Sequence, residues 1–574
     1  MYSKCDAFRS VHPMVMQLPH EVLSDEAASE PAPFTATANN PDWGEAYDQH
    51  PVVQQHPGKI VTPYACYVDG ISFTNTDSLL GMFVYSLVTY KRHLVALFRR
   101  SHQCRCGCKG WCTLYPILRV LRWSFEILAA GFFPAQNVDG PWADGSDRAA
   151  KAGSPLAIIG ALLHLKGDWA EFAHTLSFSE WSSALYCCMF CKATKKNRFD
   201  LQNFNPMETT WEPLKHEDME RACTACERWV VMSREQHRIV RGALRYDKNK
   251  KGGGRKLIVD VKSLKLKKGD RLEPSDLLPD IGQFDAIARF PCKVLFWRSG
   301  LATRCTHRNP LFDWVGCRYV IGITLLSVMI DKLHTLYLGP AQSWVVFALW
   351  ELIKMDFFKT GQTGLTLHQL SIQQLRSRLW SYYSARRQAL PEEDITEIQD
   401  LTLAMLGGKP TSQTLRTKAA ETKALVPFVL ELLREATARP AGSPLKRLLA
   451  AGEALQEYFD LLDKSPRIVP AATVQKMYDS VKRHFRLARL AGIKLKPKHH
   501  LLLHMVQRTL RHGNPGWYAT FEDEGINKIV KGIGQAAHRS VWEVRVFDHF
   551  DKAEDRRRKR PAQGGHGPRK RPRS

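Results

Sequence analysis

The stretch PYACYVDGISFTNTDSLLGMFVYSLVTYKRHLVALF, residues 63–98, contains three short apolar runs at 64–69, 81–89 and 93–98. Runs of this length that are rich in β-branched and aromatic residues predict three strands. Apolar residues then recur at helical spacing over 113–130, and a fourth apolar run follows at 155–165. The order of three strands, a helix and a strand predicts a mixed sheet with flanking helices.

Two acidic residues lie at strand ends in this pattern. Asp69 ends the first run, and Asp168 follows the fourth run in the sequence Lys166-Gly167-Asp168. In an RNase H-like nuclease core these strands lie side by side, so the two carboxylates come together. With a third carboxylate from a later helix, they can hold two Mg²⁺ ions about 4 Å apart for attack on a phosphodiester. An acidic residue that merely ends a strand is the plainer alternative.

Charge is distributed unevenly along the chain. Basic residues outnumber acidic ones by 82 to 57, which gives a net charge of +25. Residues 1–60 carry three basic against eight acidic residues, whereas residues 552–574 carry ten against two. The basic body and tail indicate a polyanionic partner, with DNA first and an acidic membrane surface second. The longest apolar run, residues 320–330, is too short to cross a bilayer, so no membrane span is expected.

A chain of 574 residues exceeds what one hydrophobic core usually serves. The apolar patterns predict a mixed α+β protein with an RNase H-like core and a block of helices from about residue 317. That this block is a large all-helical insertion that interrupts the core is what the family resemblance given below implies. We expect six segments: a disordered acidic arm at 1–60, the first part of the core at 61–185, a mixed region of cysteine pairs and basic clusters at 186–316, the helical insertion at 317–495, C-terminal helices that complete the core at 496–550, and a basic tail at 551–574.

Several short motifs occur in order along the chain. They are YVDGISF at 67–73, KGDW at 166–169, Cys188-x-x-Cys191, IDKLH at 330–334 followed by Leu338-Gly339, KPKHHLLLH at 496–504 and TFEDE at 520–524. In this order they resemble the transposases of the CACTA and Kyakuja-Dileera-Zisupton groups of eukaryotic DNA transposons. The motifs CRCGCKGWC at 104–112 and HRNPLF at 307–312 also resemble a wider set of transposon-like sequences. The resemblance spans roughly residues 61–550.

The resemblance implies a DDE transposase, or an inactive, domesticated or truncated copy of one, that cleaves and joins DNA strands. Carried over by position, Asp69 and Asp168 are the first two Mg²⁺ ligands and Glu524 is the third. Glu522 and Asp523 are adjacent alternatives, because only one of three consecutive helical residues can point at the metals. A noncatalytic, zinc-stabilised nucleic-acid-binding protein of the same ancestry is the alternative function.

The cysteines indicate structural zinc. Two pairs, Cys188 with Cys191 and Cys223 with Cys226, have a spacing that could close a tetrahedral Cys₄ site, with Cys187 as a substitute for Cys188. A second and weaker zinc candidate crowds four thiols into nine residues: Cys104, Cys106, Cys108 and Cys112. Unrelated reduced thiols are the alternative, since the chain carries no secretory signal. His500 and His504 have metal-pair spacing, and we interpret them as partly buried histidines near the acidic site.

The tail contains two basic clusters separated by a Gly/Pro spacer. They consist of Arg556, Arg557, Arg558, Lys559 and Arg560, and of Arg569, Lys570 and Arg571. This pattern predicts a two-part nuclear localisation signal, and a basic tail that contacts nucleic acid is the alternative. The nucleus is therefore the expected compartment and DNA the expected partner, with no membrane partner; a homo-oligomer is compatible with the sequence.

Overall fold

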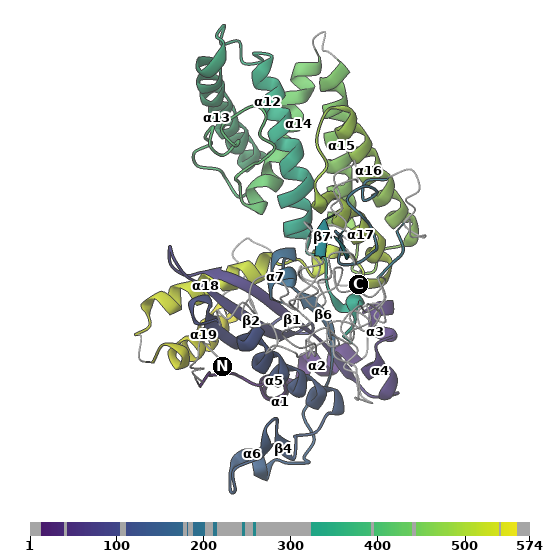
Figure 1. The fold of residues 1–574 in the computed structure, drawn as a ribbon, viewed down its shortest axis with the longest axis vertical. Coiled ribbons are helices and arrows are strands. Elements are labelled where there is room, and N and C mark those ends of the chain that lie inside the picture. The colour runs from purple at the N-terminus through teal and green to yellow at the C-terminus, as the bar shows by residue number, and fades with distance from the viewer. Residues whose placement is uncertain are drawn as a thin grey trace, which may run out of the picture. The chain divides into compact units, whose positions relative to one another are not determined.

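The computed structural model describes residues 13–38, 43–103, 111–175, 181, 187–200, 211–214, 244–246, 257–259, 323–391, 395–438, 443–538 and 541–559. They form two compact units, each with its own core (Figure 1). The sheet unit consists mainly of residues 13–175 and 523–558, and the helical unit of residues 330–522. The mixed α+β class expected from the sequence is confirmed.

A four-stranded mixed sheet organises the first unit. Its strands are β1 (Val61–Ser72), β2 (Ser78–Ser86), β3 (His93–Arg99) and β6 (Ile159–Lys166), in the order β3-β2-β1-β6. The pairs β1–β2 and β2–β3 are antiparallel, and β1–β6 is parallel. Helix α5 (Trp111–Ala130) connects β3 to β6. The predicted succession of three strands, a helix and a strand is confirmed.

Both faces of this sheet are buried. Ala65 and Tyr67 of β1 share a core with Val530 of α18 (Phe521–Ala536) and Phe550 of α19 (Trp542–Lys559). On the opposite face, the rings of Tyr64 and Phe125 of α5 lie 5.5 Å apart. Because helices cover both faces, the strands are continuous apolar runs rather than alternating ones.

The expected disordered arm is wrong for the described N-terminal residues. These form α1 (Pro19–Ser29), α2 (Pro31–Ala38), α3 (Glu45–Asp48) and α4 (Pro51–Gln55). Leu23 and Val52 are fully buried, and the backbone N–H of His20 donates to Ser124 Oγ of α5 at 3.0 Å. A few anchoring side chains therefore fix a segment whose composition is typical of a loop.

The second unit is helical. Its elements are η6 (Leu333–Ala341), α12 (Gln342–Lys354), α13 (Gly364–Ala389), α14 (Ala419–Thr437), α15 (Ser443–Lys464), α16 (Ala471–Leu490), α17 (Pro497–His512) and η7 (Pro515–Trp517). Trp344 and Trp350 of α12 are buried, and their Nε1 atoms donate to the carbonyl oxygens of Leu448 and Leu406, both at 2.9 Å. The span Leu333–Lys354 is long and apolar enough to cross a membrane, but 78% of its most apolar window is buried, which is typical of a core helix.

The remaining elements are short. They are η1 (Arg100–His102), β4 (Gln136–Asn137), β5 (Gly140–Pro141), α6 (Asp147–Ala150), α7 (Trp169–His174), β7 (Leu244–Tyr246), β8 (Leu257–Val259) and η5 (Leu325–Ser327). Strands β4–β5 and β7–β8 form two-stranded pairs.

Candidate functional site

Asp69 and Asp168 each lie two residues beyond the last pair of the β1–β6 ladder. In this parallel ladder Tyr67 of β1 is opposite Lys166, where β6 ends, so Asp69 lies further along β1 and Asp168 lies in the segment after β6. Asp168 is the N-cap of α7, and its Oδ1 accepts from the backbone N–H of Glu171 at 2.6 Å. A Cβ at Gly167 would lie 2.8 Å from the carbonyl oxygen of Val68. The glycine before Asp168 therefore allows β1 and the segment after β6 to approach closely.

Three donors hold the Asp69 carboxylate. Its Oδ2 accepts from the Tyr67 hydroxyl at 2.6 Å and from Asn527 Nδ2 at 2.7 Å, and its Oδ1 accepts from the N–H of Gly70 at 2.8 Å. Burial raises the pKa of Tyr67 well above its ordinary value, and the nearby charges of Asp69, Asp523 and Glu524 raise it further. Asn527 belongs to α18, so this helix touches β1 at Asp69.

The three consecutive acidic residues of α18 have different surroundings. Asp523 is 1% exposed, and Lys166 Nζ and Arg92 pair with it at 2.5 Å and 3.1 Å. Asp523 raises the pKa of Lys166 against the opposing effect of burial, while burial and Asp523 together raise the pKa of Tyr85 to about 12. Glu522 and Glu524 are half-buried. Asp523 and Glu524 precede Asn527 by four and three residues, and both spacings place a residue on the same helix face. Spacing therefore does not choose between them, whereas the pairing with two cations distinguishes Asp523 from Glu524.

Each unit contains a buried pair of candidate metal ligands, namely Cys188 and Cys191 in the sheet unit and His500 and His504 in the helical unit. The N–H groups of Phe190 and Ala193 donate to the sulfurs of Cys188 and Cys191 at 3.3 and 3.4 Å, and burial raises the pKa of Cys191. His500 and His504 lie one turn apart on α17, with their Nε2 atoms 3.1 Å apart. Buried thiols and imidazoles at such spacings are ligand types that could hold a metal such as zinc.

The sequence pairs Cys188 and Cys191 with Cys223 and Cys226, which lie outside the described residues, as do Cys104, Cys106, Cys108 and the side chain of Cys112. The Sγ of Cys187 faces the carbonyl oxygen of Ala193 at 3.7 Å. The four-residue spacing of His500 and His504, which places both on one helix face, is the sequence feature that indicates a pair of candidate metal ligands. Asp69, Asp168 and Glu524 form no close group of candidate metal ligands among the described residues.

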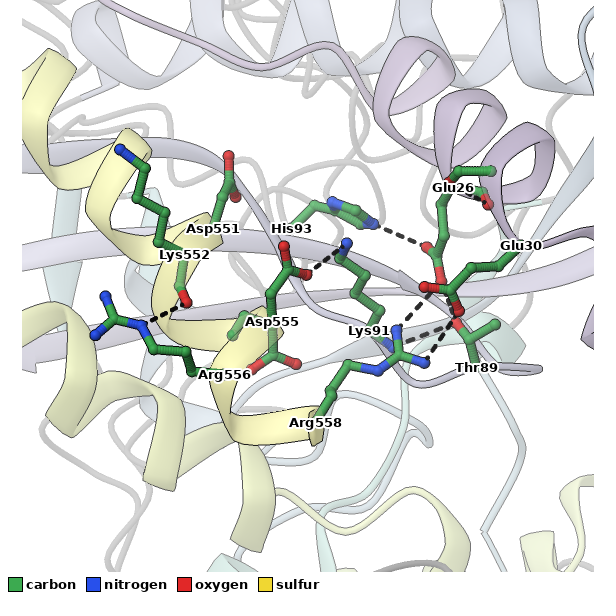
Figure 2. A network of polar contacts seen from close by, with 12 residues as sticks. Glu26, Glu30, Thr89, Lys91, His93, Asp551, Lys552, Asp555, Arg556 and Arg558 are labelled. Carbon is green, nitrogen blue, oxygen red and sulfur yellow. Dashed lines mark hydrogen bonds and ion pairs between the residues drawn. The ribbon is translucent and has the colours of Figure 1, made fainter. Parts of the chain in front are cut away.

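The first basic cluster of the tail belongs to a folded helix. Figure 2 shows α19 against α1 and the β2–β3 turn, with Lys91 paired to Asp555 at 2.8 Å. Arg558 lies 3.7 Å from Glu26 of α1 and 3.6 Å from Glu30, which follows this helix. Arg556 and Arg557 also lie on α19, whereas Arg560 and the second cluster are outside the described residues. Part of the predicted localisation signal is thus helical and contacts acidic residues.

No family model matches the chain, and neither the curated proteins nor the solved structures include one that is similar to it.

Proposed function

We propose that the chain is a transposon-derived, DDE transposase-like protein with an RNase H-like core, which cleaves and joins DNA strands at Asp69, Asp168 and Glu524. The observation that supports this proposal is the parallel register of β1 and β6, in which Asp69 and Asp168 each follow the last residue pair by two positions. The contact of Asn527 with Asp69 brings α18, which carries Glu524, to the same place. The strand order β3-β2-β1-β6 supports the proposed core.

The donor set fits Mg²⁺, because carboxylate oxygens are the ligands that this ion prefers. Two bound ions would activate the attacking oxygen and stabilise the leaving oxygen. The residues of the chain itself orient the ligands: Tyr67, Gly70 and Asn527 hold Asp69, and the N-terminus of α7 holds Asp168. The basic body would bind the DNA backbone through phosphate contacts, and the tail would direct the protein to the nucleus.

Cleavage and joining of labelled DNA by the purified protein tests this function. We expect products that require Mg²⁺ or Mn²⁺ and that disappear in Asp168→Asn, while salt-sensitive DNA binding is retained. The matched control is Asp548→Asn, an exposed residue of α19 that pairs with Lys552. Equal activity of Asp168→Asn and the wild type would remove Asp168 from the mechanism.

We further propose that Cys188 and Cys191 are ligands of a structural zinc ion, because closely spaced thiolates are typical ligands of this ion. Metal analysis of the purified protein should give one zinc per chain, and Cys191→Ser should lose it whereas Cys187→Ser keeps it. A zinc-free wild type contradicts this assignment. Zinc without cleavage of any DNA substrate would favour the alternative function, a noncatalytic zinc-stabilised nucleic-acid-binding protein.

A further inference from the structure

Asp523 lies between two cations at the start of α18. Its Oδ2 accepts from Lys166 Nζ at 2.5 Å, and its Oδ1 accepts from Arg92 Nε at 3.1 Å. The side chains of Asp523, Lys166 and Arg92 are 0%, 3% and 4% exposed. Lys166 also donates to the Tyr85 hydroxyl at 2.6 Å. Cations therefore engage both carboxylate oxygens of Asp523 inside the sheet unit.

A gain in folding stability does not by itself explain why Asp523, Lys166 and Arg92 are buried together. Charged groups lose their hydration when they are buried, and apolar residues of similar volume often stabilise a core at least as well. A buried ion cluster is instead intolerant of displacement, because any shift leaves a charge without its partner. Its effect is thus to hold the attached elements in one arrangement.

The elements that it holds are α18, β1 and β6. Asp523 and Asn527 are four residues apart and share one face of the helix. Asp523 binds Lys166 of β6, and Asn527 binds Asp69 of β1. Lys166 is opposite Tyr67 in the β1–β6 pair, so α18 is tied to both strands at nearly one level.

We propose that Asp523 is a positioning residue and not a metal ligand: its pairing with Lys166 and Arg92 seats the first turn of α18 and turns Glu524 toward Asp69. This inference rests on the proposed function for its metal-binding readout. It also selects Glu524 from the three consecutive acidic residues, since Asp523 has both oxygens occupied and directed into the core.

Three variants of the full chain test the assignment through Mn²⁺ binding, measured by calorimetry and electron paramagnetic resonance. Asp523→Asn should keep the number of bound ions but weaken their affinity about 10- to 100-fold, which is the usual effect of losing a group that orients a ligand. Glu524→Gln should lower the number of bound ions. Lys166→Gln leaves the Asp523 carboxylate in place and removes one of its partners, so it should also weaken binding. Lys528→Met, at an exposed position of α18, is the control and should bind Mn²⁺ like the wild type.

The outcomes separate the competing roles. If Asp523 were a ligand, Asp523→Asn would lose an ion and Lys166→Gln would bind Mn²⁺ as tightly as the wild type or more tightly; either result overturns the proposal. Hydrogen exchange provides a second readout that does not depend on metal: amides of residues 523–527 should exchange at least tenfold faster in Asp523→Asn. Unchanged exchange also overturns it. A wild-type chain that binds no Mn²⁺ refutes the proposed function, and the positioning role is then decided by hydrogen exchange alone.

Discussion

Gly167→Ala tests the close approach of β1, which carries Asp69, and the segment after β6, which carries Asp168. The added Cβ would lie 2.8 Å from the carbonyl oxygen of Val68, whereas ordinary contact begins at 3.4 Å. The difference requires β1 and β6 to separate locally by about 0.6 Å, because a backbone oxygen cannot rotate away as a side chain can. Overpacking of this kind typically costs about 1–3 kcal/mol of folding free energy.

The same displacement should reduce activity. A misplacement of about 1 Å in a catalytic arrangement can cost about 100-fold in rate, so we expect a loss of about tenfold or more in Mg²⁺-dependent cleavage. Denaturant unfolding and cleavage rates measure the two effects. Gly532→Ala on α18 is the control: nothing lies within 4 Å of its Cβ, so it should add about 0.5–1 kcal/mol of stability and leave activity unchanged. If Gly167→Ala were as stable and as active as the wild type, the reasoning from the strand register would be wrong.

Two further predictions concern the helical unit. Gly452→Ala would place a Cβ 2.0 Å from Cζ2 of Trp344, so we expect the free energy of unfolding to fall by at least about 1–3 kcal/mol. Thermal unfolding measures this loss, and an unchanged melting temperature would contradict the packing of α12 on α15. Burial lowers the pKa of His484 to about 4 in the folded protein, although the hydrogen bond to the carbonyl oxygen of Ala451 opposes this shift. In the unfolded chain the same histidine has a pKa of about 6.5. The unfolded state therefore binds more protons below about pH 6.5, and stability should fall as the pH drops from there toward about 4. The denaturant midpoint should therefore change less between pH 7.5 and pH 5 in His484→Gln than in the wild type. An equal change in both proteins would show that His484 does not cause the loss of stability.

The sheet could be predicted from sequence because its strands are buried on both faces. Continuous apolar runs make such strands visible, and the observed β1 contains the predicted run 64–69 within Val61–Ser72. The N-terminal helices could not be predicted, because they lack such continuous apolar runs. They have between 4 and 11 residues, and few apolar side chains anchor them. Pro19, Pro31 and Pro51 each begin a helix, where a proline is well tolerated, yet in a segment rich in proline, alanine and serine they suggest a loop.

The candidate site could be predicted only where its signals are local. Asp69 and Asp168 follow apolar runs, so their places next to the strands could be predicted, although β1 continues past Asp69 to Ser72. The choice among Glu522, Asp523 and Glu524 could not be predicted, because consecutive helical residues differ only in direction. The partners that distinguish Asp523 are far away in sequence: Lys166 lies 357 positions before it and Arg92 lies 431 positions before it. Only the folded chain brings these cations to one carboxylate.

The variant Lys166→Gln distinguishes two ways in which Lys166, Arg92 and Asp523 could affect metal binding: through their electric field or by holding α18 in place. Lys166, Arg92 and Asp523 together carry one net positive charge next to Asp69. If the trio acted only through its field, Lys166→Gln would remove that positive charge and strengthen the binding of a divalent cation. If it acts by holding α18 in place, the same change loosens the helix and weakens binding. Asp523→Asn cannot make this distinction, since it adds net positive charge and also disrupts the contact. Weaker Mn²⁺ binding in Lys166→Gln would therefore show that geometry, rather than the field of the trio, sets the affinity of the site.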